Sequence, residues 1–209
     1  MTAARVREIP GPAGRLEAIL EEPASVRGAV VFAHPHPQYG GTMHTKVVYQ
    51  GAKAFARTGC AVLRFNFRGV GTSEGAWDEG RGELDDFKAA LDFMRARHPD
   101  VPLWAAGMSF GSWIALTAGA EDSRVTTLVG IAPPLANYDF EKVRTSVKPK
   151  FFVQGEFDEI CPLKDMYAFY ARCADPKELI VIEAADHLFD GKVTDVGEAI
   201  EDLLGDWNE

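Results

Sequence analysis

Cysteine, long apolar runs and basic residues are all scarce in this sequence, and each shortage argues against a class of protein. The cysteines are three, with no C-x-x-C pair, which argues against a disulfide framework or a zinc site and favours free thiols. No apolar run approaches the roughly 18 residues that a membrane-spanning helix needs. Lys and Arg number 22 against 31 Asp and Glu, and the net charge of −9 argues against nucleic acid and anionic membranes as partners.

The start and the bulk composition point to an ordinary globular protein. Residues 1–23 carry no apolar stretch behind their charges, so we expect no secretory signal and a cytoplasmic location. Hydrophobic residues make up 46% of the chain and charged residues 25%, a globular balance. The 209 residues are the size of one domain, so we expect a single domain over 1–209, as a monomer or homodimer.

Short apolar runs alternate with segments of helical periodicity along most of the chain. This alternation predicts repeated strand–helix units, and therefore a mostly parallel sheet with helices on both faces. A turn (PGPAG) separates the first two strands, so the sheet is expected to begin with an antiparallel pair. The predicted strands are 6–9, 15–22, 28–33, 61–67, 101–106, 126–131, 150–154 and 178–183. The predicted helices are 44–57, 83–97, 109–120, 163–173 and 193–207.

The sequence contains G-x-S-x-G twice, and the context distinguishes the two copies. Where a strand runs directly into a helix, the sharp turn exposes the serine hydroxyl and the helix N-terminus faces the reacting oxygen. The copy GMSFG around Ser109 lies between a predicted strand and a predicted helix. The copy GTSEG around Ser73 is followed by a loop rich in glycine and acid (AWDEGRGE). We therefore predict that Ser109 is a nucleophile and that Ser73 is not.

A serine nucleophile needs a base and an acid, which in such proteins follow in the order Ser, acid, His. Strand 150–154 is followed by GEFDEICP, and strand 178–183 by AADHLF. Both loops leave the edge of the sheet from which Ser109 leaves, because all strand-to-helix loops of a parallel sheet share one edge. His187 is the predicted base. Asp158, Glu156, Glu159 and Asp186 compete as the acid; the resemblance of the motif to a known family favours Asp158, with Glu156 second.

When a serine attacks a carbonyl group, a tetrahedral intermediate with a negatively charged oxygen forms, and two backbone N–H donors are needed to stabilise that oxygen. One should come from Phe110, the residue after the nucleophile. The other should come from the loop HPHPQYGG, which follows strand 28–33. Pro35 and Pro37 have no N–H, so the loop donor is most simply His36.

Three histidines and one arginine each allow both a functional and a structural interpretation. His34, His36 and His44 could be metal ligands, but no carboxylate or cysteine lies at a matching spacing, so we predict no metal and no cofactor. Arg68 follows the strand 61–67 in a glycine-rich loop, where we expect it to tie loops together rather than to contact substrate.

Five motifs of the sequence together resemble those of a known family. HPHPQYGG, RFNFRGVGTSEG, GMSFG, GEFDEICP and AADHLF occur in this order. Together they resemble the small, lidless bacterial α/β-hydrolases related to dienelactone hydrolases and serine esterases, from about residue 28 to the end. The resemblance implies an α/β-hydrolase fold with a mostly parallel sheet of about eight strands. It also implies a triad of Ser109, Asp158 and His187, and an oxyanion hole at His36 and Phe110. Dienelactone hydrolases proper use a cysteine nucleophile, so lactone hydrolysis is not implied.

The segment 132–149 falls where many α/β-hydrolases carry a cap, and it is too short for one. Its Leu135, Tyr138 and Phe140 could contact an acyl chain, or equally well seal the edge of the sheet. The predicted activity is hydrolysis of a small carboxylic ester or thioester through an acyl-enzyme. Acyl transfer or perhydrolysis by the same triad, and a non-catalytic binding protein on this scaffold, are the alternatives.

Overall fold

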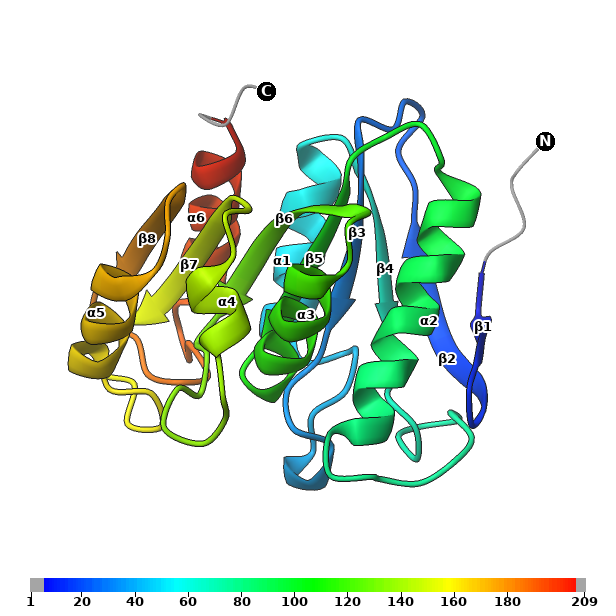
Figure 1. Ribbon diagram of the computed structural model, residues 1–209, viewed down its shortest axis with the longest axis horizontal. Coiled ribbons are helices and arrows are strands. Elements are labelled where there is room, and N and C mark those ends of the chain that lie inside the picture. Colours follow the sequence, from blue (N-terminus) through cyan, green and yellow to red (C-terminus); the bar gives the residue numbers. More distant parts are fainter. Residues whose placement is uncertain (1–5, 206–209) are drawn as a thin grey trace.

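A twisted, mostly parallel sheet forms the centre of the computed structural model, which describes residues 6–205 (Figure 1). Its eight strands lie in the order β1-β2-β4-β3-β5-β6-β7-β8. β2 is antiparallel to both β1 and β4, and the remaining neighbours are parallel, so the predicted antiparallel start is confirmed. The strands are β1 (Glu8–Gly11), β2 (Gly14–Glu21), β3 (Gly28–Ala33), β4 (Cys60–Phe65), β5 (Leu103–Met108), β6 (Val125–Ile131), β7 (Lys150–Gly155) and β8 (Lys177–Ile182).

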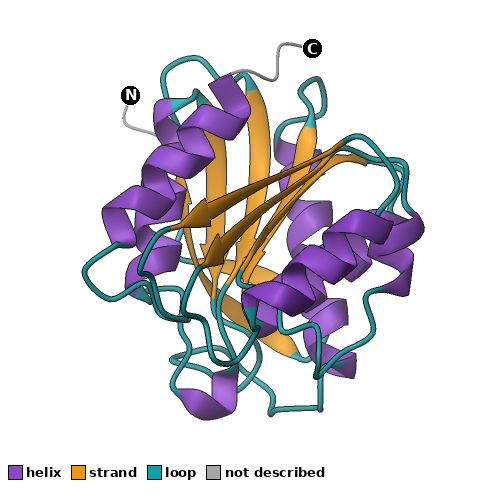
Figure 2. Cartoon of the chain, turned by 90° about the vertical axis from the view of Figure 1, so that its left-hand side faces the viewer, coloured by secondary structure: helices purple, strands orange, loops and turns teal. Residues whose placement is uncertain are grey.

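Helices cover both faces of the sheet, as predicted (Figure 2). One buried cluster contains α1 and α6 side chains, and a second, on the opposite face, contains side chains from α2 to α5. The helices are η1 (Pro37–Tyr39, a 3₁₀ turn), α1 (Lys46–Arg57), α2 (Arg81–Arg97), α3 (Phe110–Glu121), α4 (Glu141–Thr145), α5 (Leu163–Arg172) and α6 (Val193–Gly205). The end of the last predicted helix, at Trp207, lies outside the described residues.

The two central strands show why the sheet is buried on both sides. All six residues of β3 and all six of β4 are buried. Along β3, Val30 and Phe32 pack toward α1 and α6, while Ala29 and Val31 pack toward the other face, because successive side chains of a strand point to opposite faces. The continuous apolar runs in the sequence thus correspond to strands covered by helices on both faces.

The site-bearing loops leave the carboxyl ends of the parallel strands, at the lower edge of the sheet in Figure 1. The segment between β6 and β7 holds only the short α4, so no cap domain is inserted there. α4 and η1 were not predicted, since a single turn of helix leaves too short a periodic pattern in the sequence. Most other boundaries moved by one or two residues.

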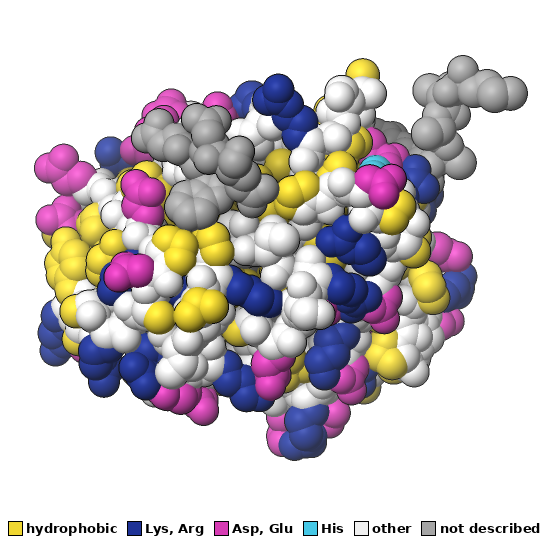
Figure 3. Space-filling model, turned by 45° about the horizontal axis from the view of Figure 1, so that its top comes forward, with side chains coloured by type: hydrophobic (Ala, Val, Ile, Leu, Met, Phe, Trp, Pro, Cys, Tyr) yellow, Lys and Arg dark blue, Asp and Glu magenta, His cyan; other side chains and the backbone are white. Residues whose placement is uncertain are grey.

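The described surface adds two observations. No helix within residues 6–205 is long and apolar enough to cross a membrane. On the face turned toward the viewer in Figure 3, basic and acidic side chains are interspersed, so the net negative charge does not produce a patch of one sign on that face.

Candidate active site

Ser109 occupies a sharp turn between β5, which ends at Met108, and α3, which begins at Phe110. Its backbone has φ 53° and ψ −124°, a conformation that side-chain-bearing residues rarely adopt. The flanking glycines make this turn possible. A Cβ on Gly107 would lie 2.1 Å from the Gly111 carbonyl oxygen, and one on Gly111 would lie 2.4 Å from the His34 carbonyl oxygen. The motif glycines are therefore required by close backbone approach.

A chain of two hydrogen bonds connects three residues from three different loops. Ser109 Oγ lies 2.9 Å from His187 Nε2, and His187 Nδ1 lies 2.8 Å from Asp158 Oδ2. A carboxylate can only accept, so Nδ1 carries the proton and Nε2 of the neutral imidazole is free to accept from the serine hydroxyl. Each of the three residues is at most 9% exposed. The arrangement can remove the serine proton as the oxygen attacks a carbonyl.

The Asp158 carboxylate is held by donors on both oxygens. Oδ1 accepts from the backbone N–H groups of Ile160 and Cys161, and Oδ2 accepts from Gln154 Nε2 at 2.9 Å as well as from His187. Burial alone would raise the pKa of Asp158. The hydrogen bonds from His187, Cys161 and Gln154, together with the attraction of His187, outweigh burial and hold that pKa below its usual value. Asp158 is therefore a carboxylate at neutral pH.

The competing acids lie elsewhere in the same loops. Glu156 accepts from the backbone N–H of Ala184, which ties the loop after β7 to the loop after β8. Asp186 accepts from the N–H groups of Leu188 and Asp190 and so shapes the loop around His187. Among the described residues, Asp158 is the acid that contacts the imidazole.

The two predicted oxyanion donors border the same small cavity as Ser109. This cavity has a volume of about 110 Å³, and His36 and Phe110 line it. Within residues 6–205, neither of their backbone N–H groups donates to another group. The His36 ring accepts from the Gln38 N–H and packs against the rings of Phe110 and Trp77. Burial lowers the pKa of the His36 ring.

His34 connects the loop that follows β3 to the segment that follows β4. Its Nε2 accepts from the Phe67 N–H, so its Nδ1 carries the proton and faces the Pro35 carbonyl oxygen at 2.6 Å. Burial lowers the pKa of His34 to about 4, which keeps the ring neutral. Both nitrogens of His34 are used within the fold, and the described residues contain no group of three side chains placed to hold a metal ion.

Arg68 and Ser73 have structural contacts. Arg68 makes a two-pronged ion pair with the buried Asp86, and its backbone N–H donates to the same carboxylate. Ser73 Oγ donates to the Asn66 carbonyl and accepts from the Glu17 N–H, so this hydroxyl joins β2 to the segment that follows β4. Arg68 thus ties its loop to α2 rather than to another loop, and among the described residues the hydroxyl that contacts His187 is that of Ser109.

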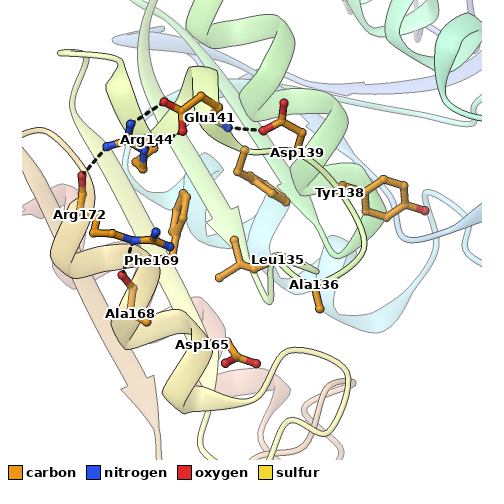
Figure 4. A pocket seen from close by; sticks show the side chains of 11 residues that line it. Leu135, Ala136, Tyr138, Asp139, Glu141, Arg144, Asp165, Ala168, Phe169 and Arg172 are labelled. Atoms are coloured by element: carbon orange, nitrogen blue, oxygen red, sulfur yellow. Dashed lines mark hydrogen bonds and ion pairs between the residues drawn. The ribbon is translucent and has the colours of Figure 1, made fainter.

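The apolar residues of the β6–β7 segment are divided between two cavities. Tyr138 lines the Ser109 cavity together with Pro134, Asn137 and Ile160. Leu135 and Phe140 line a larger cavity of about 480 Å³ between α4 and α5 (Figure 4). Tyr138 borders that cavity too. Of these cavity residues the sequence singled out Tyr138 but not Pro134, Asn137 or Ile160, because a loop without periodicity does not reveal which side chains point inward.

Gln154 is the other residue that sequence reasoning missed. Its signal was present, since KFFVQG places a lone amide at the end of an otherwise apolar strand, directly before the acid-bearing loop. Buried polar side chains of this kind are expected to have a specific hydrogen-bond partner.

Comparison with known proteins identifies the family to which the chain belongs. Residues 24–145, more than half of the chain, match the family described as serine aminopeptidase, S33. The chain belongs to this family of hydrolases. The matched region of this S33 hydrolase includes Ser109 and the loop HPHPQYGG but ends before Asp158 and His187. The chain is also similar to protein RP471 of Rickettsia prowazekii, with 35% identity over 204 residues that cover 93% of this chain and 86% of the relative.

Two solved structures are similar to this S33 hydrolase in both fold and sequence. An α/β serine hydrolase homologue from Coxiella burnetii has a TM-score of 0.90 and 35% identity, and the match covers 98% of each chain. XC6422 from Xanthomonas campestris, described as an α/β serine hydrolase without a lid, has a TM-score of 0.89 and 34% identity, covering 98% of this chain and 94% of the other. The predicted α/β-hydrolase fold and the resemblance to lidless hydrolases are thus confirmed.

Proposed function

We propose that this α/β serine hydrolase cleaves small carboxylic esters or thioesters through an acyl-enzyme on Ser109. The observation that carries the proposal is the continuous hydrogen-bonded path from the Ser109 hydroxyl through His187 to Asp158. Burial of all three groups supports it, because proton transfer along such a path is most effective where water is excluded.

The first half of the reaction forms the acyl-enzyme. Ser109 Oγ attacks the carbonyl carbon as its proton moves to His187 Nε2, and Asp158 stabilises the resulting imidazolium. The negative charge that develops on the carbonyl oxygen is stabilised by the free N–H groups of His36 and Phe110. The tetrahedral intermediate then collapses, His187 returns the proton to the departing alcohol or thiol, and the acyl group stays on Ser109.

The second half releases the acid by the same steps in reverse order. A water molecule gives its proton to His187 Nε2 and attacks the acyl carbon, again with the oxyanion facing His36 and Phe110. Collapse breaks the bond to Ser109 Oγ, which takes the proton back from His187. Water contributes the hydroxyl of the product acid, and the enzyme is regenerated unchanged.

The dimensions of the cavity support a small acyl group. Its volume of about 110 Å³ is well below the ~300 Å³ at which pockets for drug-sized ligands begin. Pro134, Tyr138 and Ile160 give it apolar walls. A short acyl chain fits this space, while the leaving group extends past the open rim, where no cap domain covers it.

Labelling with a fluorophosphonate tests the assignment of the nucleophile. The reagent should label the wild type and Ser73→Ala but not Ser109→Ala, because both serines lie in G-x-S-x-G and only one faces an imidazole. Labelling that persists in Ser109→Ala and disappears in Ser73→Ala would overturn the proposal.

A substrate panel tests the reaction class. The proposal expects faster turnover of p-nitrophenyl acetate or butyrate than of the dodecanoate, and little cleavage of aminoacyl p-nitroanilides. Added alcohol or peroxide separates hydrolysis from acyl transfer and perhydrolysis, since a transferase would convert most of the acyl group to the new ester or peracid. Faster cleavage of the anilides would indicate a peptidase instead.

A further inference from the structure

Gln154 lies in β7, one residue before the strand ends, and is completely buried. Its side-chain nitrogen lies 2.9 Å from Asp158 Oδ2 and 2.9 Å from the Cys161 carbonyl oxygen. One amide thus connects the start of the acid-bearing loop to the acid itself and to the end of the loop. Gln154 lines neither the Ser109 cavity nor the cavity between α4 and α5.

The orientation of this amide follows from its neighbours. The carboxylate oxygen of Asp158 and the Cys161 carbonyl can only accept, so the nitrogen of Gln154 must face them. As a result, the Gln154 Oε1 atom is buried with no hydrogen-bond partner among the described residues. The amide therefore keeps its donor on the Asp158 carboxylate.

Asp158 Oδ2 is shared between Gln154 and His187, while the backbone N–H groups of Ile160 and Cys161 hold Oδ1. The two backbone donors fix one oxygen of the carboxylate. Gln154 is the second donor to the other oxygen, beside His187. We infer that Gln154 is a positioning residue, which holds the Asp158 carboxylate so that Oδ2 meets His187 Nδ1. This inference rests on the proposed function, in which Asp158 orients the base.

The inference has a consequence for the pH dependence of the reaction. Without the Gln154 donor, the negative charge on Asp158 Oδ2 is less stabilised by hydrogen bonding. The Asp158 carboxylate then stabilises the protonated form of His187 more strongly. The acid limb of the kcat/KM profile should therefore move to higher pH. A residue that only stabilised the fold would change the amount of folded enzyme but leave this profile in place.

The experiment replaces Gln154 with methionine, which has a similar length and no N–H donor, and with leucine as a second apolar variant. Gln50→Met on α1 is the matched control. Fluorophosphonate titration counts the functional sites in each preparation, so that kcat is expressed per labelled site. We expect kcat about 10-fold lower or more in the Gln154 variants, an unchanged KM, and an acid limb displaced upward. Gln50→Met should match the wild type.

A double-mutant cycle with Asp158→Asn separates this inference from the proposed function. If Gln154 acts through Asp158, Gln154→Met should have little further effect in the Asp158→Asn background. An equal loss in both backgrounds, or an unchanged pH profile with full kcat per labelled site, would overturn the inference. Full activity of Asp158→Asn alone would instead overturn the role proposed for the acid.

Discussion

The strained backbone at Ser109 should reverse the usual effect of glycine on stability at this position. Replacing alanine by glycine normally destabilises a protein, because glycine has more conformational freedom to lose on folding. At position 109 the order should be reversed. The φ of 53° and ψ of −124° are accessible to glycine without strain, whereas alanine retains the strain that serine has. Ser109→Gly should therefore be more stable than Ser109→Ala, although both are inactive.

The magnitude follows from two opposing contributions. A side-chain-bearing residue in such a conformation costs on the order of 1–3 kcal/mol. The extra freedom of glycine in the unfolded chain costs roughly 0.5–1 kcal/mol. Both variants lose the hydrogen bond to His187, so that loss cancels in the comparison. The expected difference is about 1 kcal/mol in favour of Ser109→Gly, or about 2–4 °C in Tm for a chain of this size.

Thermal and urea unfolding of the two variants at one pH measure this difference. Ala168→Gly, on an exposed position of α5, is the matched control and should lower the free energy of unfolding by about 1 kcal/mol. If Ser109→Gly were less stable than Ser109→Ala by a similar amount, the turn would hold no strain. Such a result would refute the strain inferred from the Ser109 backbone angles.

Three further predictions concern the surrounding residues. Asp158→Asn should lower kcat by about 10⁴-fold at neutral pH, measured with p-nitrophenyl acetate, because the amide favours the wrong imidazole tautomer; a loss below 10-fold would contradict the role of the acid. His36 has φ −54°, which proline can adopt, so His36→Pro should be about 10²–10³-fold slower than His36→Ala, and equal rates would remove this N–H from the oxyanion hole. The pKa of His34 is about 4 in the folded protein and 6.5 in the free side chain. Between these two pH values the unfolded chain therefore binds a proton on His34 that the folded protein does not bind. Stability should fall by up to about 3 kcal/mol as pH drops through that window, and urea unfolding of His34→Gln should lack this part of the slope.

The fold was largely predictable because its signals are local. The run GAVVFA indicates a buried strand without knowledge of its neighbours, and the PGPAG turn indicates an antiparallel start. The strand order was not available from the sequence in the same way, because β4 lies between β2 and β3 and no local pattern records that crossover. α4 was missed because five residues are too few to show helical periodicity.

The candidate site was predictable in its residue types and order but not in its contacts. Ser109, Asp158 and His187 each follow a recognisable strand, so the shared edge of a parallel sheet placed them together. The choice of Asp158 over Glu156 depends on which side chain turns inward, and that is decided by backbone donors within the loop. Tyr138 and Leu135 are neighbours in one segment, yet only Tyr138 lines the serine cavity.

Trapping the acyl-enzyme tests the central claim most directly. The protein would be mixed with excess p-nitrophenyl butyrate, quenched in acid within the first turnover, digested and mapped by mass spectrometry. A butyryl group on the peptide containing Ser109, at up to one per chain, is the predicted result. A butyryl group on any other residue, or steady turnover by Ser109→Ala at the wild-type rate, would contradict the account.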